Sequence, residues 1–363
     1  WRQRAAREAT VALSSPVDQD GHILPNVTRI DRFDIVRLLD KGTFGTVFQA
    51  YDNKWHHHVA LKVVRRVRRY VEDAEFEVSI LNSLADLDRK GLNCVQLYKY
   101  FHYKGHLCIV TELLGDSVYH QLRRFRQTRR MVSLKTIWAV AKRLLEALAF
   151  LRSVQLVHAD LKTENVLLSK PGMTLDGDVD VKLIDFGGAT WEDDVHSKVI
   201  QTRHYRAPEV VLGLKWSYPC DLWSLGCILL ELTETRLTFD THDTAQHLAM
   251  IERLCGPVPR RLIRKIPEDL GVVKSLFDRD GTLRWPELAQ GRAEEEKVHL
   301  VLPLSRVESF MGGRQLKELL TPMLQIDPDK RWTPDRLLDH FWGPNAVSPY
   351  RDARPHPDAA PEM

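Results

Sequence analysis

The sequence predicts an α+β protein of two lobes, in which a small β-rich lobe precedes a larger helical one. The chain has 363 residues, more than one ordinary hydrophobic core supports, so two compact units are expected. Short β-branched and aliphatic runs dominate from Phe33 to about Val110, whereas long amphipathic runs dominate after Gly115. Hydrophobic residues make up 44% of the chain and charged residues 28%, which is typical of a globular protein.

Bulk charge, hydropathy and cysteine spacing argue against several classes of protein. A formal net charge of +3 is too small to predict direct nucleic-acid binding. No apolar run approaches the ~18 residues of a membrane span, so no membrane association is expected. The 5 cysteines form no CxxC pair, which favours free thiols in a reducing, intracellular compartment.

The first lobe, predicted at residues 33–113, follows a polar N-terminal extension at residues 1–32. Its expected strands lie at residues 33–40, 46–52, 57–64 and 107–114. A helix is expected at about residues 69–87, where Ala74, Val78 and Leu81 recur at helical spacing.

The second lobe, predicted at residues 114–342, should be mainly helical. The clearest helical runs lie at residues 134–154, 221–234, 314–325 and 334–342. The run at 221–234 is apolar nearly all round, which predicts a buried helix. An insert is expected at about residues 256–306, and a Pro-rich tail at residues 343–363 is expected to be disordered.

The stretch DRDGTLRWPE (278–287) within the insert resembles part of a calcium-binding EF-hand loop. The first ligand position of such a loop would be Leu276, whose side chain cannot bind Ca²⁺. Asp280-Gly281, flanked by apolar residues, instead predicts a hairpin turn.

Two glycines, Gly42 and Gly45, lie in the strand–turn–strand pattern LLDKGTFGTVFQAYD (38–52). Glycines at such a turn let backbone amides approach phosphate oxygens without a Cβ in the way. The pattern alone is also that of a plain hairpin turn. It is not a Walker loop, because no GK[ST] follows.

Lys62 lies in the apolar run VALK (59–62), where alternation places it on one face with Ala60 and Val64. In isolation it could be an exposed lysine of an edge strand. Glu77, however, lies on the apolar stripe of the following helix, and a carboxylate there needs a cation or it protonates. We therefore predict an ion pair between Lys62 and Glu77.

Three further motifs carry a specific resemblance. HADLKTEN (158–165) resembles the protein-kinase catalytic loop HRDxxxxN, KLIDFGGAT (182–190) contains DFG, and RHYRAPEV (203–210) contains APE. With VALK they stand in the order and with the gaps found in protein kinases. The resemblance covers about residues 33–342 and implies the two-lobed protein kinase fold, with ATP and Mg²⁺ as cofactors.

The resemblance also implies roles for individual residues. Asp160 would accept the proton of the attacking hydroxyl, and Lys162 would neutralise charge on the moving γ-phosphoryl group. Asn165 and Asp185 would hold Mg²⁺. The implied ATP-binding residues are Leu39, Asp40, Lys41, Gly42, Thr43, Phe44, Gly45, Thr46, Val47, Ala60, Lys62, Glu77, Glu112, Leu114 and Leu167.

Two positions depart from the kinase pattern. Asp40 stands at the first glycine position of the phosphate loop, where a carboxylate repels phosphate, so weaker ATP binding is expected. Ala159 replaces the arginine that in many kinases pairs with a phosphorylated residue of the activation segment. We therefore expect activity that depends little on phosphorylation, although Thr190, Ser197 and Thr202 are candidate modification sites.

Two stretches are similar to hallmarks of the LAMMER, or CDC-like, kinases of the CMGC group. HLAMIER (247–253) is similar to EHLAMMER, and QTRHYRAPEV (201–210) is similar to STRHYRAPEV. The resemblance implies a dual-specificity enzyme that autophosphorylates on Tyr and phosphorylates Ser and Thr of arginine–serine-rich splicing factors. It also implies a nuclear setting, and we expect a monomer that is present in the cytoplasm as well. The resemblance to protein kinases in general implies an ion pair between Glu209 and Arg331.

Two alternatives stay open. One is another CMGC kinase, such as a relative of the SR-protein or dual-specificity tyrosine-regulated kinases, against which HLAMIER argues. The other is a pseudokinase scaffold that binds nucleotide without transferring phosphate. Asp40 and Ala159 support the scaffold hypothesis, whereas the full set of catalytic side chains argues against it.

Overall fold

The computed structural model describes residues 21–22, 27–88, 91–194, 197, 199–309 and 313–344. The chain divides into two compact units between Leu114 and Gly115, next to the boundary expected from the sequence. Most of the N-terminal extension and nearly all of the tail fall outside the described residues. The disorder expected at residues 343–363 therefore stays a prediction.

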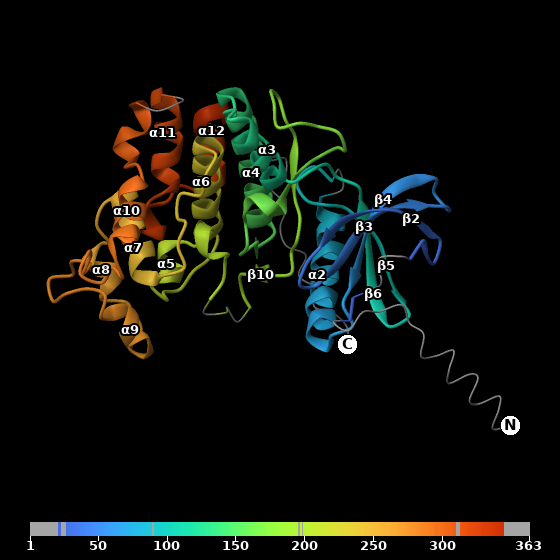
Figure 1. Ribbon diagram of the computed structural model, residues 1–363, viewed down its shortest axis with the longest axis horizontal. Helices are drawn as coiled ribbons and strands as arrows, with labels where there is room; N and C mark the ends of the chain where they lie inside the picture. Colours follow the sequence, from blue (N-terminus) through green and yellow to red (C-terminus); the bar gives the residue numbers. More distant parts are fainter. Residues whose placement is uncertain are drawn as a thin grey trace, which may run out of the picture. The chain divides into compact units, whose positions relative to one another are not determined.

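The N-terminal unit is an antiparallel sheet with one helix (Figure 1). The strand order is β1-β2-β3-β4-β6-β5. The elements are β1 (Arg29–Ile30), β2 (Phe33–Lys41), β3 (Gly45–Asp52), β4 (His57–Val64), α2 (Arg68–Leu87), β5 (Leu97–Tyr103) and β6 (His106–Glu112). The strands and the helix expected from the sequence are thus confirmed within a few residues.

Both faces of this sheet are covered by apolar side chains. Because side chains alternate along a strand, Val63 of β4 packs with Phe33 and Leu61 in one cluster. The neighbouring Val64 packs with Val78 of α2 in the other. The sheet begins earlier than expected, at β1, because Ile30 is fully buried in the first cluster. The end of the predicted extension is therefore part of the folded unit.

The C-terminal unit is mainly helical, with two short antiparallel strand pairs, β7 with β10 and β8 with β9. Its helices are α3 (Val118–Thr128), α4 (Leu134–Ser153), α5 (Pro208–Val211), α6 (Pro219–Glu234), α7 (Thr244–Cys255), α8 (Arg260–Ile263), α9 (Gly271–Lys274), α10 (Arg292–Leu300), α11 (Gly313–Met323) and α12 (Pro334–Trp342). Its strands are β7 (Leu156–Val157), β8 (Val166–Leu168), β9 (Val181–Leu183) and β10 (Thr190–Trp191).

Helix α6 lies at the centre of this unit. Every residue from Cys220 to Thr233 is buried, as the apolar pattern predicts. Helix α4 packs against both α6 and α12. None of the described helices is long and apolar enough to cross a bilayer.

The insert contains α8, α9 and α10 and the turn predicted at Asp280-Gly281. The N–H of Asp278 donates to the carbonyl of Thr282 at 2.9 Å. Phe277 and Leu283 form a single antiparallel bridge, and Gly281 takes a φ of +80°, which favours glycine. The hairpin turn is confirmed, although pairing extends over only one bridge.

Candidate active site

The glycine loop joins β2 to β3, and its two glycines serve different purposes. A Cβ on Gly45 would collide with the carbonyl oxygen of Val63, because β3 runs close against β4 there. A Cβ on Gly42 would meet nothing within 4 Å. The loop closes through the N–H of Gly42, which donates to the carbonyl of Gly45 at 3.0 Å. Gly45 is therefore required by packing, and the space beside Gly42 is open.

The tip of the loop, Thr43-Phe44, is held by residues that the sequence did not single out. The backbone N–H of Arg65 donates to the carbonyl of Phe44 at 2.9 Å. Its guanidinium donates to the carbonyl of Thr43 at 3.0 Å. The same guanidinium stacks over the ring of Tyr70, which meets the Phe44 ring edge to face at 5.3 Å. The tip is therefore tied to the start of α2.

Asp40 is exposed on β2, beside an irregularity in the pairing of β2 with β3. Its Oδ1 accepts a hydrogen bond from the N–H of Lys41 at 2.9 Å. The other predicted loop residues differ in burial: Leu39 and Val47 are half-buried, Lys41 and Thr43 are exposed, and Thr46 is buried. The Thr46 hydroxyl lies 3.4 Å from Nδ1 of His22, in the N-terminal extension.

The predicted pair of Lys62 and Glu77 is confirmed. Nζ of Lys62 donates to Oε2 of Glu77 at 2.6 Å, and the glutamate side chain is 8% exposed. Lys62 and Ala60 share one face of β4, as the alternation predicts. The ion pair fixes the direction of the lysine ammonium.

Two of the predicted ATP-binding residues, Glu112 and Leu114, lie at and just after the end of β6. The carboxylate of Glu112 accepts a hydrogen bond from the N–H of Gln96 at 2.8 Å, which anchors this end of the strand. Leu114, the last residue of the N-terminal unit, is buried. Leu167, another predicted ATP-binding residue, is half-buried on β8 of the C-terminal unit. The roles of these residues toward ATP stay predictions.

The catalytic loop begins after β7 and is hydrogen-bonded to the first turn of α6. The carboxylate of Asp221 accepts hydrogen bonds from the N–H of His158 at 2.7 Å and of Ala159 at 3.0 Å. Ala159 has a φ of +61°, a left-handed conformation that is costly for alanine. Burial raises the pKa of Asp221, while the neighbouring His158 and the two N–H donors oppose that shift. Asp221 therefore fixes the backbone immediately before Asp160.

Both carboxylate oxygens of Asp160 are engaged. Oδ1 accepts hydrogen bonds from the hydroxyl of Thr202 at 2.7 Å and from its N–H at 2.9 Å. Oδ2 accepts from Nζ of Lys162 at 2.6 Å. Nζ of Lys162 also lies 3.2 Å from the Thr202 hydroxyl. The predicted base and the predicted cation are thus brought together.

Asn165 and Asp185, the predicted Mg²⁺ ligands, are brought to one end of the β8–β9 pair. The N–H of Ile184 donates to the carbonyl of Asn165 at 3.0 Å. Nδ2 of Asn165 donates to the carbonyl of Asp160 at 2.9 Å, which leaves its Oδ1 as the atom for a cation. In the described part of the chain, nothing donates a hydrogen bond to the Asp185 carboxylate. Two such oxygen donors fit a hard divalent cation.

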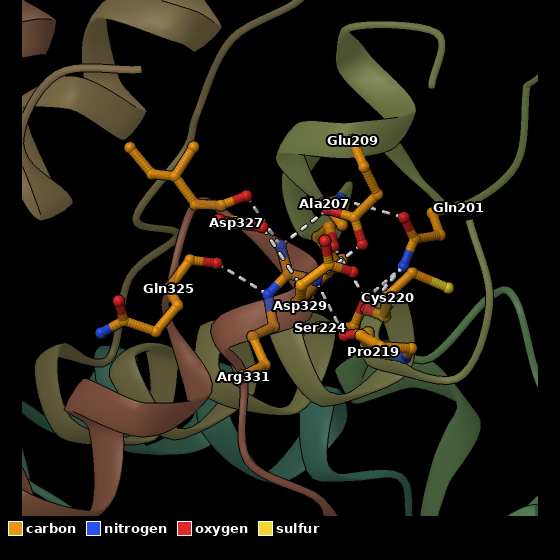
Figure 2. A network of polar contacts seen from close by, with 12 residues as sticks. Gln201, Ala207, Glu209, Pro219, Cys220, Ser224, Gln325, Asp327, Asp329 and Arg331 are labelled. Atoms are coloured by element: carbon orange, nitrogen blue, oxygen red, sulfur yellow. Dashed lines mark hydrogen bonds and ion pairs between the residues drawn. The ribbon is translucent and has the colours of Figure 1, made fainter. Parts of the chain in front are cut away.

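The predicted pair of Glu209 and Arg331 is also confirmed, and both side chains are fully buried. Two guanidinium nitrogens reach the two carboxylate oxygens at 2.6 Å each. Figure 2 shows the surrounding network, in which Arg331 also donates to the carbonyls of Pro219 and Gln325. The APE motif is therefore joined to the start of α6 and to the segment after α11.

Thr163, at the position where kinases usually have proline, belongs to a buried polar cluster. Its hydroxyl lies 3.0 Å from the hydroxyl of Tyr205, which donates to Glu231 at 2.6 Å. Glu231 also pairs with Arg126 at 2.8 Å. Burial raises the pKa of Glu231, and the hydrogen bond from Tyr205 and the charge of Arg126 oppose it. The cluster joins the catalytic loop to α6 from a second side.

This arrangement of Asp160, Lys162, Asn165 and Asp185, in a helical unit that follows a β-rich unit, is that of a protein kinase. The chain belongs to the protein kinase domain family, which matches residues 33–343. A crystal structure of the kinase domain of PF14_0431 matches with a TM-score of 0.81 and 31% identity, over 90% of this chain and 100% of that one.

The relatives narrow the family to the LAMMER type of dual-specificity kinase. Dual specificity protein kinase lkh1 of Schizosaccharomyces pombe is 38% identical, over 89% of this chain and 49% of that protein. Serine/threonine-protein kinase AFC1 of Arabidopsis thaliana is 37% identical, over 90% of this chain and 74% of that protein. Dual specificity protein kinase CLK2 of Mus musculus is 37% identical, over 89% of this chain and 66% of that protein. The chain thus spans about half the length of lkh1.

Proposed function

We propose that this chain transfers the γ-phosphoryl group of Mg-ATP to Ser and Thr of arginine–serine-rich splicing factors, and to Tyr in autophosphorylation. The observation that carries the proposal is the engagement of Asp160 by both Lys162 and Thr202. A base and a cation oriented together are what phosphoryl transfer to a hydroxyl requires.

In this proposal Asp160 accepts the proton of the attacking hydroxyl, and Lys162 offsets negative charge that develops on the transferred group. The Lys62 ammonium, directed by Glu77, binds ATP phosphates. Asn165 and Asp185 would hold Mg²⁺, which neutralises phosphate charge when bound. The backbone of the glycine loop, tied down through Arg65, offers N–H groups to phosphate oxygens.

The proposed substrate class is the one that the sequence resemblance to LAMMER kinases implies, and the charge of one exposed segment supports it. Glu192, Asp193 and Asp194 form an acidic run directly after β10, and both aspartates are exposed. An acidic run favours encounter with arginine-rich substrates. We further propose a monomer that acts in the nucleus and the cytoplasm, where such substrates occur.

The test is phosphate transfer from Mg-ATP to an arginine–serine repeat peptide, with a proline-directed peptide of equal length as the comparison. Asp160→Asn is the matched inactive control, because it keeps the size of the side chain and removes the base. Strong transfer to the repeat that depends on Asp160 would support the proposal. Preference for the proline-directed peptide would indicate another CMGC specificity.

A third outcome separates enzyme from scaffold. If ATP binds in a direct binding assay but is not transferred to either peptide or to the chain itself, the protein is a nucleotide-binding scaffold. In that case Asp40 and Ala159 become the first positions to restore to the kinase pattern.

A further inference from the structure

Gln201, directly before Thr202, uses every polar atom of its side chain. Its Nε2 donates to the carbonyl of Cys220 at 3.0 Å and to the hydroxyl of Ser224 at 2.8 Å. Its Oε1 accepts from the N–H of Ala207 at 2.9 Å. The residue is 7% exposed, and Figure 2 shows it between α6 and the start of the APE motif.

The backbone of Gln201 is held as firmly as its side chain. Its N–H donates to the carbonyl of Ala159 at 3.0 Å, and its carbonyl accepts from the guanidinium of Arg206 at 2.8 Å. Gln201 therefore connects the residue before Asp160 with the first two turns of α6. The next residue, Thr202, then meets Asp160.

The conformation of Gln201 needs these partners. Its φ is +64°, a left-handed backbone that is unfavourable for a non-glycine residue. Two donors and one acceptor are required at once from a single side chain, and a primary amide supplies them. The serine of the LAMMER hallmark STRHYRAPEV has one hydroxyl on a shorter side chain and cannot make the same three bonds.

The hydrogen bond between Gln201 and Ala159 bears on how phosphorylation could regulate this chain. An arginine at that position could hold a phosphorylated residue and so order the segment from Asp185 to Glu209, here called the activation segment. Alanine has no charge with which to do so. In this chain the carbonyl of Ala159 instead accepts the Gln201 N–H.

We propose that Gln201 is a positioning residue that holds residues 199–207 of the activation segment against α6 and presents Thr202 to Asp160 without a phosphate. The inference rests on the proposed function, in which Asp160 receives the substrate proton. It goes beyond that function because it assigns phosphate-independent activity to one amide side chain.

The first arm of the test is the unphosphorylated wild-type protein, prepared by phosphatase treatment and verified by mass. Its transfer rate to the arginine–serine peptide should equal that of the untreated protein. A large loss that returns on rephosphorylation would overturn the proposal, because a phosphate would then order the segment.

The second arm uses Gln201→Glu, which keeps the acceptor and removes both donors, and Gln201→Ser, the milder change to the family residue. In Gln201→Glu, kcat should fall about tenfold or more, the loss that ~1.4 kcal/mol produces, while KM for ATP stays unchanged. The kcat of Gln201→Ser should lie between that of Gln201→Glu and that of the wild type. An unchanged kcat in both variants would refute the proposal.

The matched control is Gln246→Glu on α7. Gln246 is also buried, and its amide donates to the carbonyl of Glu294 at 3.0 Å. This change should lower the melting temperature and leave kcat unchanged, which separates a loss of stability from a loss of positioning.

A readout without catalysis keeps the two proposals distinguishable. Hydrogen exchange of peptides covering residues 199–207 should show protection in the unphosphorylated wild type and loss of protection in Gln201→Glu. If those peptides exchange freely in the wild type, the inference about Gln201 fails even if the enzyme is active. If they are protected but no phosphate is transferred, only the proposed function fails.

Discussion

The hydroxyl and the backbone N–H of Thr202 donate to the same oxygen, Oδ1 of Asp160, at 2.7 and 2.9 Å. The carboxylate plane is thereby set from the activation segment, while Lys162 holds the other oxygen. A phosphate on Thr202 would remove this hydroxyl donor and place negative charge beside Asp160. The structure thus disfavours Thr202 as an activating modification site.

Thr202→Val should lower kcat roughly 10- to 100-fold, since a hydrogen bond to a charged group is worth about 1.5–3 kcal/mol. Thr202→Ser keeps the hydroxyl and should retain most of the activity. Steady-state kinetics with the arginine–serine peptide, combined with thermal melts of each variant, measure the effect. Equal activity of the Val and Ser variants would show that the hydroxyl has no part in orienting Asp160.

Asp40→Gly should lower KM for ATP. At an effective dielectric of about 20 and a separation of about 8 Å, a carboxylate repels a phosphate charge by roughly 2 kcal/mol. Because Asp40 is exposed, solvent and salt screening reduce this to an expected change of about threefold. Titrations of nucleotide at low and high salt check it, with Asp34→Gly, at the start of the same strand, as the control. If KM is unchanged at low salt, the electrostatic argument is wrong.

Arg331→Met should destabilise the C-terminal unit by about 3–5 kcal/mol, because it leaves the fully buried Glu209 without its cation. The double variant Glu209→Gln with Arg331→Met should recover part of that loss, since no buried charge then lacks a partner. Urea unfolding of the two single variants and the double variant measures the coupling. Additive losses would mean that the pair does not act as a unit.

His247 of the HLAMIER stretch should make the free energy of unfolding decrease as pH falls. The side chain is fully buried, and neither ring nitrogen has a hydrogen-bond partner among the described residues. Burial is the largest cause of a pKa lowered to about 3. The charges of Arg203, Arg206 and His204 contribute to the same lowering of the pKa. The folded-state pKa lies below the unfolded value of 6.5, so the contribution is fully present above pH 6.5 and is lost as pH falls toward 3.

Between neutral pH and pH 5 this loss should amount to about 2 kcal/mol, from ~1.4 kcal/mol per pH unit below 6.5. His247→Leu should remove that part of the pH dependence, which urea unfolding at both pH values measures. Substitution of the exposed His299 serves as the control. If His247→Leu and wild type lose equal stability on acidification, the buried histidine is not the cause.

The sequence predicted those parts of the fold and site that depend on local pattern and on fixed motifs. The ion pairs of Lys62 with Glu77 and of Arg331 with Glu209 are both present. The first was predictable because a carboxylate on a buried helix stripe requires a cation, and the second because the resemblance to protein kinases implies it. The buried helix α6 followed from an apolar run that has no polar face.

Other contacts depend on tertiary folding and leave no trace in a local pattern. Arg65 and Tyr70 stand in what reads as an ordinary basic run, yet they hold the loop tip at Thr43 and Phe44. Ile30 belongs to a segment without periodicity, and only its burial in the sheet core shows where the unit begins. Asp221 lies in an apolar run from which the sequence predicts only a buried helix.

Three functional parts of the C-terminal unit are hydrogen-bonded to the first two turns of α6. Asp221 carries the catalytic loop, Cys220 and Ser224 receive the activation segment through Gln201, and the carbonyl of Pro219 receives Arg331. Gentle warming should therefore not yield a population of folded molecules with a loosened reaction centre. Heat inactivation and the melting of this helix should follow one curve, so we expect activity to be lost cooperatively and not gradually.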